Sequence, residues 1–391
     1  MVEIDPLLGI TGIVILGVTA QWIAWRLRIP SILILLFFGF IVGPLYGFLN
    51  PTKLLGDLLH PVVSLSVAII LFEGGLGLKV RELEQVGRVV RNLITFGALI
   101  NWALMTAAAY YLLDLRLEMS LLLGAILIVT GPTVVIPLLR EIRPGKQLLS
   151  VLKWEGIVID PVGAMVAVLT FEAILAGEAQ SATSLAVFGV ANTILVGSII
   201  GFLGARILLF FLGRYAIPDH LQSPVTLMFV IATFTLSNNL QPESGLLTAT
   251  VLGITLANQV KVNVRQIVEF KETLGILLIS VVFVLLAAKL DLDNIHEIPR
   301  WQAVGFIAFL IFVARPISAY ASTMRSELSR KERFFVACLA PRGIVAAAVA
   351  SIFSYKLVEL NHPGAEELVT LTFLVIFSTV IFYSITAPFI A

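Results

Sequence analysis

The chain of 391 residues is 59% hydrophobic and 13% charged, with a mean hydropathy of +1.01. This composition excludes an ordinary soluble domain, which is about half apolar and about a quarter charged. A net charge of +1 argues against a nucleic-acid-binding surface, and a single cysteine, Cys338, excludes a disulfide framework. The chain is therefore predicted to be a polytopic membrane protein.

Thirteen apolar segments approach the length of about 20 residues that a bilayer crossing needs. In chain order they lie at residues 7–25, 31–49, 61–78, 92–114, 119–139, 152–176, 184–212, 222–238, 243–258, 270–288, 301–323, 334–355 and 367–390. Each is predicted to be a helix, because hydrocarbon leaves backbone polar groups no outside partner. The chain begins MVEIDPLL, without a basic region, so we interpret the first segment as a membrane helix rather than a cleavable signal peptide.

The Lys and Arg residues alternate with these segments. Nineteen of the 26 lie in loops on one side, five lie on the other side, and Arg315 and Arg342 fall within spans. Because basic loops favour the cytoplasm, we expect thirteen crossings with the N-terminus outside and the C-terminus inside. The sequence ends with its last span. Two interpretations stay open: a protein without a cytoplasmic tail, or the membrane part of a protein with a cytoplasmic regulatory domain.

Six charged side chains fall inside or near the ends of apolar segments, where charge is costly and usually functional. They are Glu73, Glu155, Asp160, Glu172, Arg315 and Arg342. Glu172 lies near the outer end of its span and is expected to reach the interface. For Glu73 two readings stay open, the wall of an aqueous funnel and a structural acceptor.

Asp160 lies about two turns inside span six and precedes Pro161, which removes a helical hydrogen bond near residue 157. Two acids and two arginines allow one ion pair to be structural while one acid stays free. We expect Glu155 to pair with Arg342, and Asp160 to be the working carboxylate.

Two spans contain Gly and Pro in mid-membrane, which makes a continuous helix unfavourable. Span five carries the TGPT break, Thr130, Gly131, Pro132 and Thr133; span twelve carries Pro341, Arg342 and Gly343. The spans are seven apart, so they run in opposite directions. Paired breaks in inverted halves indicate a transporter binding site, where carbonyls meet a cation and buried charges compensate the half-helix ends.

At these residues the chain resembles the monovalent cation/proton antiporters, in particular NhaP-type sodium/proton exchangers. The motifs are LFEGGL (71–76), TGPT (130–133), EGIVIDPVGA (155–164), SGLLTATVLGI (244–254) and APRGIV (340–345). The resemblance, which is to bacterial and archaeal members, implies a protein of a prokaryotic inner or plasma membrane. It implies two inverted repeats with crossing broken helices. It implies a core at about 92–176 and 301–391, interface spans of a homodimer at about 7–78 and 222–288, and a linker helix at 184–212.

The resemblance also implies that Asp160 binds a proton and a cation alternately, and that Glu155 pairs with Arg342. Gly131, Gly156 and Ile159 stand where the family commonly has side chains that are polar or acidic. We expect Thr130 and Thr133, broken-helix carbonyls, water and possible help from Glu73 to complete the cation shell around Asp160. Na⁺ is the first expectation, with Li⁺ and K⁺ open.

With Ile159 leaving one acid at the site, we expect one proton to exchange for one cation with no net charge moved. A proton-coupled organic anion transporter is an alternative, although Asp160 and Glu155 disfavour an anion. A channel is disfavoured, because the sequence shows no selectivity-filter motif. A membrane enzyme is disfavoured, because the sequence has no histidine cluster with the spacing of zinc ligands. The four histidines, His60, His220, His296 and His362, all lie at or near span ends. No cofactor is expected.

Overall fold

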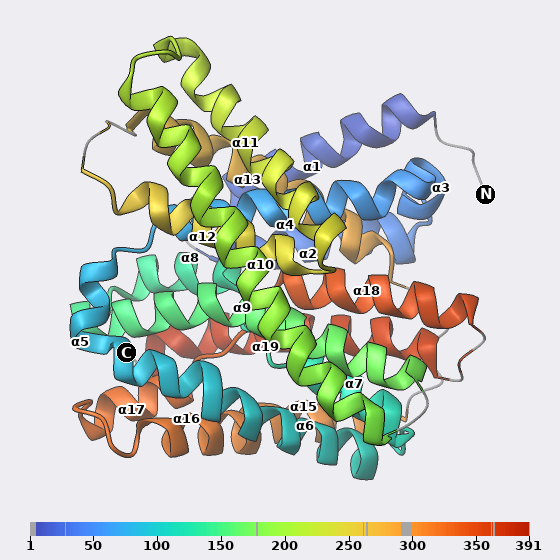
Figure 1. Ribbon diagram of the computed structural model, residues 1–391. Helices are drawn as coiled ribbons and strands as arrows, with labels where there is room; N and C mark the ends of the chain where they lie inside the picture. The colour runs from blue at the N-terminus through green and yellow to red at the C-terminus, as the bar shows by residue number, and fades with distance from the viewer. Residues whose placement is uncertain are drawn as a thin grey trace.

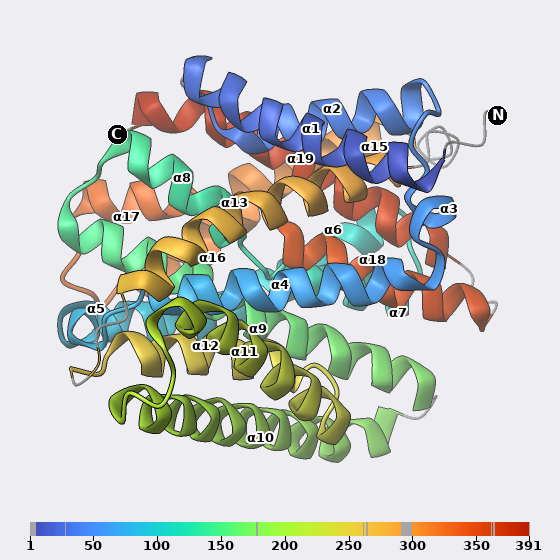
Figure 2. The same ribbon diagram turned by 90° about the horizontal axis from the view of Figure 1, so that it is seen from above.

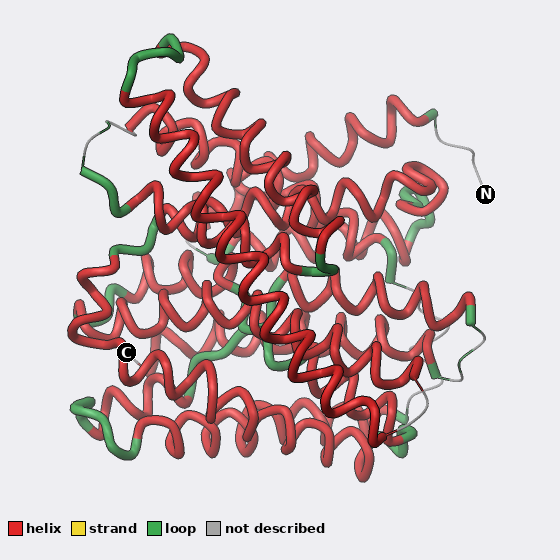
Figure 3. Tube along the Cα trace, viewed as in Figure 1, coloured by secondary structure: helices red, strands yellow, loops and turns green. Residues whose placement is uncertain are grey.

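The computed structural model describes residues 5–27, 29–176, 179–260, 262, 265–290, 299–360, 362 and 364–390. His296 lies outside these residues, as do the side chains of Pro132 and Thr133. The described part of the chain consists of helices joined by turns and short loops, with no strand (Figure 3). An all-α fold was predicted from the apolar segments, and it is confirmed.

The first half of the chain contains a series of helices with two π turns, η1 and η3. These elements are α1 (Pro6–Leu27), α2 (Ser31–Phe40), η1 (Ile41–Leu45), α3 (Pro51–Leu55), α4 (Leu59–Leu76), α5 (Val80–Asn92), η3 (Leu93–Gly97), α6 (Ala98–Leu112), α7 (Leu117–Ile126), α8 (Pro132–Ile142) and α9 (Lys146–Ala176). Proline and glycine lie where continuous helix fails: Pro44 within η1, and Gly131 directly before α8.

The second half continues with long helices and one further π turn, η5. Its elements are α10 (Ala179–Gly213), α11 (Gln222–Leu240), α12 (Ser244–Ala257), α13 (Arg265–Ala288), α15 (Arg300–Phe309), η5 (Leu310–Ala314), α16 (Arg315–Thr323), α17 (Arg330–Ala337), α18 (Ile344–Glu359) and α19 (Ala365–Ile390). A capping box starts α17, where the Ser329 hydroxyl accepts from the Glu332 backbone N–H and the Glu332 carboxylate accepts from the Ser329 backbone N–H.

Each of the thirteen predicted segments coincides with a helix, a helix with a π turn or a pair of half-helices. By length and composition, eight helical stretches of the described chain can cross a membrane, and four more apolar helices are shorter. The two chain ends lie at opposite ends of the molecule in both views, which agrees with an odd number of crossings (Figures 1 and 2). The count of thirteen crossings stays a prediction.

The helices form two groups that meet mainly where α9 packs against α10 and α12, and where α18 packs against α4. In Figure 1, α1, α2, α4 and α11–α13 form the upper group, α6–α9 with α15–α19 form the lower one, and α10 runs diagonally across both. The upper group contains a buried cluster of hydroxyls, in which the Thr248 Oγ1 donates to the Ser237 Oγ at 2.7 Å and Ser237 and Ser244 share a bond of 2.6 Å. Such polar contacts and small residues hold membrane helices together where lipid gives no hydrophobic drive.

A close approach within the upper group joins α4 to α12. A Cβ atom on Gly75 would lie 2.6 Å from the Thr250 carbonyl oxygen, and one on Gly253 would collide with the Phe72 carbonyl oxygen. These two glycines therefore allow backbone-to-backbone contact beside the LFEGGL and SGLLTATVLGI segments. This contact fixes α4 and α12 relative to each other, and both helices also contact α9.

We predict that Gly253→Ala destabilises the protein, because the added methyl group forces α4 and α12 apart. Overpacking of this kind costs roughly 1–3 kcal/mol. The matched control is Gly305→Ala, since a Cβ atom there would meet nothing within 4 Å. Thermal unfolding in detergent should give a lower Tm for the first variant and an unchanged or higher Tm for the second; equal Tm values would contradict the packing described.

Candidate functional site

Two interrupted helices cross in the interior of the lower group. Residues 127–131 separate α7 from α8, and residues 338–343 separate α17 from α18. Figure 3 draws loop segments between helices in this central region. The backbone N–H of Gly131 donates to the Pro341 carbonyl at 3.1 Å, and a Cβ atom on Gly131 or Gly343 would collide with the other residue's Cα. The two breaks predicted from Gly and Pro residues are confirmed, and so is their crossing, which the resemblance implied.

The carbonyl groups at the end of α7 accept hydrogen bonds from two other segments, the second break and α6. The Arg342 Nη1 donates to the carbonyls of Ile128 at 3.1 Å and Val129 at 3.0 Å. The Asn101 Nδ2 donates to the Leu127 carbonyl at 3.2 Å. Arg342 is 1% exposed, so its positive charge acts on the negative end of the half-helix with little screening by water.

A second arginine serves the carbonyl end of α17 in the same way. The Arg315 guanidinium donates to the Val336 carbonyl at 2.9 Å from Nη2 and 3.2 Å from Nε, and to the Leu339 carbonyl at 3.2 Å from Nη2. Arg315 begins α16, directly after the π turn η5. Each break in the membrane interior thus has a buried arginine at its carbonyl end.

The expected Glu155–Arg342 pair is wrong, because Glu155 pairs with Arg315. The Arg315 Nη1 lies 2.5 Å from the Glu155 Oε1, and the Arg315 Nη2 lies 3.0 Å from the Glu155 Oε2. This bidentate geometry is the strong form of an ion pair. The physical reason for the correction is position: Arg342 reaches the carbonyls of the opposite break through its Nη1, and Arg315 is the arginine that lies beside Glu155. The Arg342 Nε and Nη2 have no hydrogen-bond partner among the described residues.

Asp160 is buried with 0% exposure and makes none of these contacts. Neither carboxylate oxygen has a hydrogen-bond partner among the described residues. Ile157, one turn earlier on α9, lies against Gly74 of α4, and a Cβ atom on Gly163, one turn later, would collide with Val129. Asp160 therefore lies on α9 between a contact with α4 and a contact with the first break.

The other predicted cation ligands, Thr130, Thr133 and Glu73, lie on different segments. Thr130 lies in the first break and is 4% exposed. Pro132 is the first residue of α8, but its side chain and that of Thr133 lie outside the described part of the structure. Glu73 is half-buried on α4, and its carboxylate lies directly against Gly275 of α13. No described contact joins Glu73 to Asp160.

Sequence reasoning missed several buried polar residues around the breaks. Asn101 stands in the apolar run LINWAL, and an amide inside such a run was an available signal. The Thr379 Oγ1 accepts from the Arg342 backbone N–H at 3.2 Å, and Tyr383, one turn later on α19, is 0% exposed. Nothing in the sequence separates Thr379 from the other hydroxyls of the last span, which mostly bond to their own helix.

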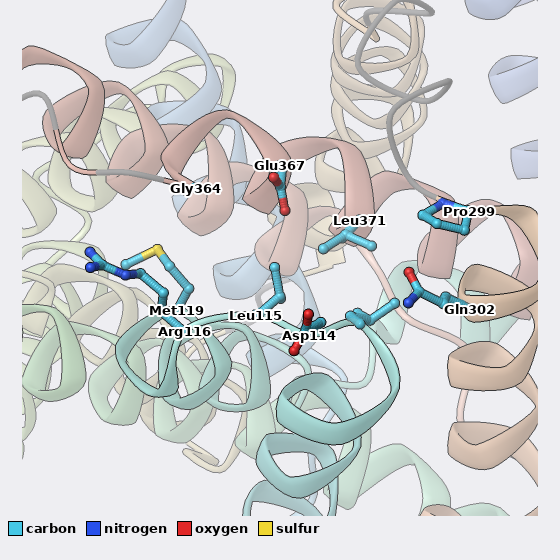
Figure 4. Close-up of a pocket in the computed structure, with 10 residues that line it drawn as sticks. Asp114, Leu115, Arg116, Met119, Pro299, Gln302, Gly364, Glu367 and Leu371 are labelled. Carbon is cyan, nitrogen blue, oxygen red and sulfur yellow. The ribbon is translucent and has the colours of Figure 1, made fainter.

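A cavity of about 490 Å³ lies elsewhere, at the turn between α6 and α7 (Figure 4). Figure 4 shows the Glu367 side chain of α19 directed toward Leu115 and Asp114 of this turn. Neither Asp160 nor Thr130 lines the cavity. It is therefore separate from the crossing of the broken helices.

Comparisons with known proteins agree on the kind of protein that has this arrangement. The family model "Sodium/hydrogen exchanger, transmembrane" matches residues 12–391. The chain is 24% identical over 369 residues to the probable Na(+)/H(+) antiporter 2 of Methanocaldococcus jannaschii, covering 89% of this chain and 84% of that protein. It is 26% identical to the Na(+)/H(+) antiporter 1 of the same organism, covering 89% and 83%.

A further relative carries a different cation in its name. The K(+)/H(+) antiporter NhaP2 of Shewanella sp. (strain ANA-3) is 27% identical over 357 residues, which is 90% of this chain but 60% of that protein. Among solved structures, the sodium proton antiporter MjNhaP1 from Methanocaldococcus jannaschii matches with a TM-score of 0.87 over 98% of both chains, at 22% identity. At that identity the likeness establishes a common fold.

We predict that double-mutant cycles will give a large coupling free energy between Glu155 and Arg315 and a smaller one between Glu155 and Arg342. Arg315→Gln leaves the Glu155 carboxylate buried and uncompensated, and loss of one partner of a buried pair costs roughly 3–5 kcal/mol. Adding Glu155→Gln removes that stranded charge, so the double variant should recover part of the lost Tm in detergent. The control cycle pairs Glu155→Gln with Arg342→Gln; a larger coupling there would overturn the pairing.

Proposed function

The chain belongs to the sodium/hydrogen exchanger family, and we propose that it is a secondary active transporter that exchanges a monovalent cation for protons. The observation that carries this proposal is the condition of Asp160. It is fully buried, and its oxygens have no hydrogen-bond partner in the described chain, while Glu155 and Arg315 form an ion pair. A carboxylate in such a position requires a proton or a cation for stability.

Competition at Asp160 is sufficient for exchange. A proton bound to the carboxylate removes the negative charge that attracts the cation, and a bound cation excludes the proton. If the loaded site can turn to either side and the empty charged site cannot, each cycle moves a cation one way and a proton the other. Na⁺ is proposed first because the relatives named as Na⁺ antiporters match over most of their own length.

Thr130 is the proposed second cation ligand, because it is buried in the break that lies against α9 next to Asp160. The carbonyls of Leu127, Ile128 and Val129 already accept hydrogen bonds from Asn101 and Arg342. A shell with few protein ligands leaves room for water and gives weak discrimination by size. K⁺ and Li⁺ are therefore further candidate substrates, and relatives named K⁺/H⁺ antiporters support K⁺.

The balance of buried charge supports an electroneutral cycle. Glu155, Arg315 and Arg342 are bound to one another or to backbone carbonyls, so their charges do not change during turnover. Asp160 carries either one proton or one monovalent cation, and the charge of the loaded site is the same in both cases. One cation for one proton follows from this equality.

The proposed moving part is the lower group, which contains the site and corresponds to the core expected at about 92–176 and 301–391. The upper group would form the interface of a homodimer through spans at about 7–78 and 222–288, with 184–212 as linker. We also propose that the N-terminus is outside, that the C-terminus is cytoplasmic, and that a cytoplasmic regulatory domain can accompany this membrane domain. An organic anion is disfavoured as substrate, since the buried Asp160 carboxylate, which has no hydrogen-bond partner among the described residues, would repel it.

We predict that Asp160→Asn abolishes cation-driven proton movement in proteoliposomes loaded with a pH-sensitive dye. An amide cannot be protonated and deprotonated near neutral pH, and it lacks the charge that attracts a cation. The matched control is Glu172→Gln, which removes an exposed carboxylate from the same helix and should retain exchange. Exchange by the Asp160→Asn variant at the wild-type rate would refute the assignment.

We also predict that the exchange rate does not respond to an imposed membrane potential. A potential set with K⁺ and valinomycin acts only on a cycle that moves net charge. The initial rate of Na⁺/H⁺ exchange should be the same at zero and at inside-negative potential. A rate that rises or falls steeply with the potential would contradict one-for-one stoichiometry and leave the role of Asp160 to be judged on its own test.

A further inference from the structure

The face of the lower group that lies farthest from α1, α11 and α13 is formed by α6, α15 and α16 (Figure 1). Near one end of this face, the helix made of α5, η3 and α6 meets α16. The Asn92 Nδ2 donates to the Ser322 carbonyl at 3.2 Å, and a Cβ atom on Gly97 would lie 2.7 Å from the Ser322 Oγ. The two helices are thus in direct contact along a line marked by Asn92, Gly97 and Ser322.

Three exposed arginines lie close in sequence to the residues of this contact. Arg88 and Arg91 are exposed on α5, one turn before and directly before Asn92, and Arg325 is exposed just past the end of α16. The opposite face of α5 is fixed by burial of Val86, Val89 and Val90. The arginines therefore stay on the outer surface, on both sides of the line of contact.

Exposed apolar side chains continue from these arginines along the same two helices. On one helix Phe96 is 64% exposed and Leu99 is 55% exposed; on the other, Ile317 is 47% exposed and Tyr320 is 41% exposed. They lie on the membrane-crossing side of the Asn92–Ser322 contact. The exposed Glu84 and Glu327 lie near these arginines in the sequence, so three positive charges face two negative ones. The surface thus keeps a net positive charge at the boundary of the predicted span and is apolar within the span.

We propose that this surface, defined by Arg88, Arg91, Arg325, Phe96, Leu99, Ile317 and Tyr320, binds an anionic phospholipid. Its phosphate headgroup contacts the three arginines, and its acyl chains cover the apolar side chains below. Guanidinium groups suit phosphate because they present several donors in one plane. Charge complementarity selects an anionic lipid, and the apolar part selects a lipid over a soluble acidic peptide, which would leave those side chains uncovered.

A lipid in this position would contact both α5–α6 and α16, which carry Asn101 and Arg315. These two residues serve the carbonyl ends of the two breaks. Lipid binding is therefore expected to stabilise the pair of helices behind the site. The inference does not depend on which cation is transported or on whether exchange is electroneutral.

The test uses the purified full chain, delipidated in a maltoside detergent, with phosphatidylglycerol or phosphatidylcholine added. Binding is read by native mass spectrometry and by the Tm. The triple variant Arg88→Gln, Arg91→Gln and Arg325→Gln is compared with wild type. The matched control removes three exposed arginines elsewhere, through Arg26→Gln, Arg206→Gln and Arg214→Gln.

Phosphatidylglycerol should bind wild type and the control and raise their Tm, and the triple variant should bind it roughly 100-fold more weakly, given about 1 kcal/mol for each arginine near the headgroups. The single variant Arg91→Gln should lose about fivefold, which keeps the proposal testable if the triple variant does not fold. Unchanged affinity in both variants, equal binding of phosphatidylcholine by wild type, or equal loss in the control would overturn the proposal.

Discussion

The structure depends on how two broken helices end inside a membrane. A helix interrupted in hydrocarbon exposes carbonyl groups that neither lipid nor water can satisfy, together with the negative end of its dipole. Here each carbonyl end receives a buried guanidinium from another segment, Arg342 for α7 and Arg315 for α17. The two breaks can lie against each other at Gly131 and Gly343 because both ends are compensated.

This compensation determines which buried charge is available for chemistry. Arg315 is also bound by Glu155, so that pair is neutral and fully engaged, and the Arg342 Nη1 is held by carbonyls. Asp160 is the buried carboxylate of α9 that has no hydrogen-bond partner among the described residues, while Arg342 keeps its Nε and Nη2 without a partner there. The rigid pairs keep the surroundings of Asp160 constant while its own occupant changes, which is what an exchanger of two small cations needs.

The sequence predicted the helices and their interruptions well, because both follow from local chemistry. Long apolar runs, the alternation of basic loops, and Gly and Pro in mid-span are properties of short segments. The partner of Glu155 could not be predicted in this way. Arg315 and Arg342 are both single arginines in apolar spans, and only the folded positions of α16 and α17 next to α9 bring Arg315 to Glu155. The motif containing Arg342 favoured the wrong arginine.

The same limit applies to the ligands. Thr130 was expected near Asp160 because of its place in the break; it is buried in that break, where Val129 lies against Gly163 of α9, and its part in the cation site stays a proposal. Glu73 was expected as a helper from its depth in the membrane, yet its carboxylate lies against α13, a direction set by packing of α4 that periodicity does not reveal. Asn101 was overlooked, although an amide in an apolar run must find a partner.

The most direct measurement of competition at Asp160 is proton release on cation binding to the purified protein. Titration calorimetry with NaCl in buffers of different ionisation enthalpy gives the number of protons released for each Na⁺ bound. The account predicts one proton released per Na⁺ at a pH where Asp160 is protonated, and neither binding nor release in Asp160→Asn. Saturable Na⁺ binding without release of a proton would contradict it.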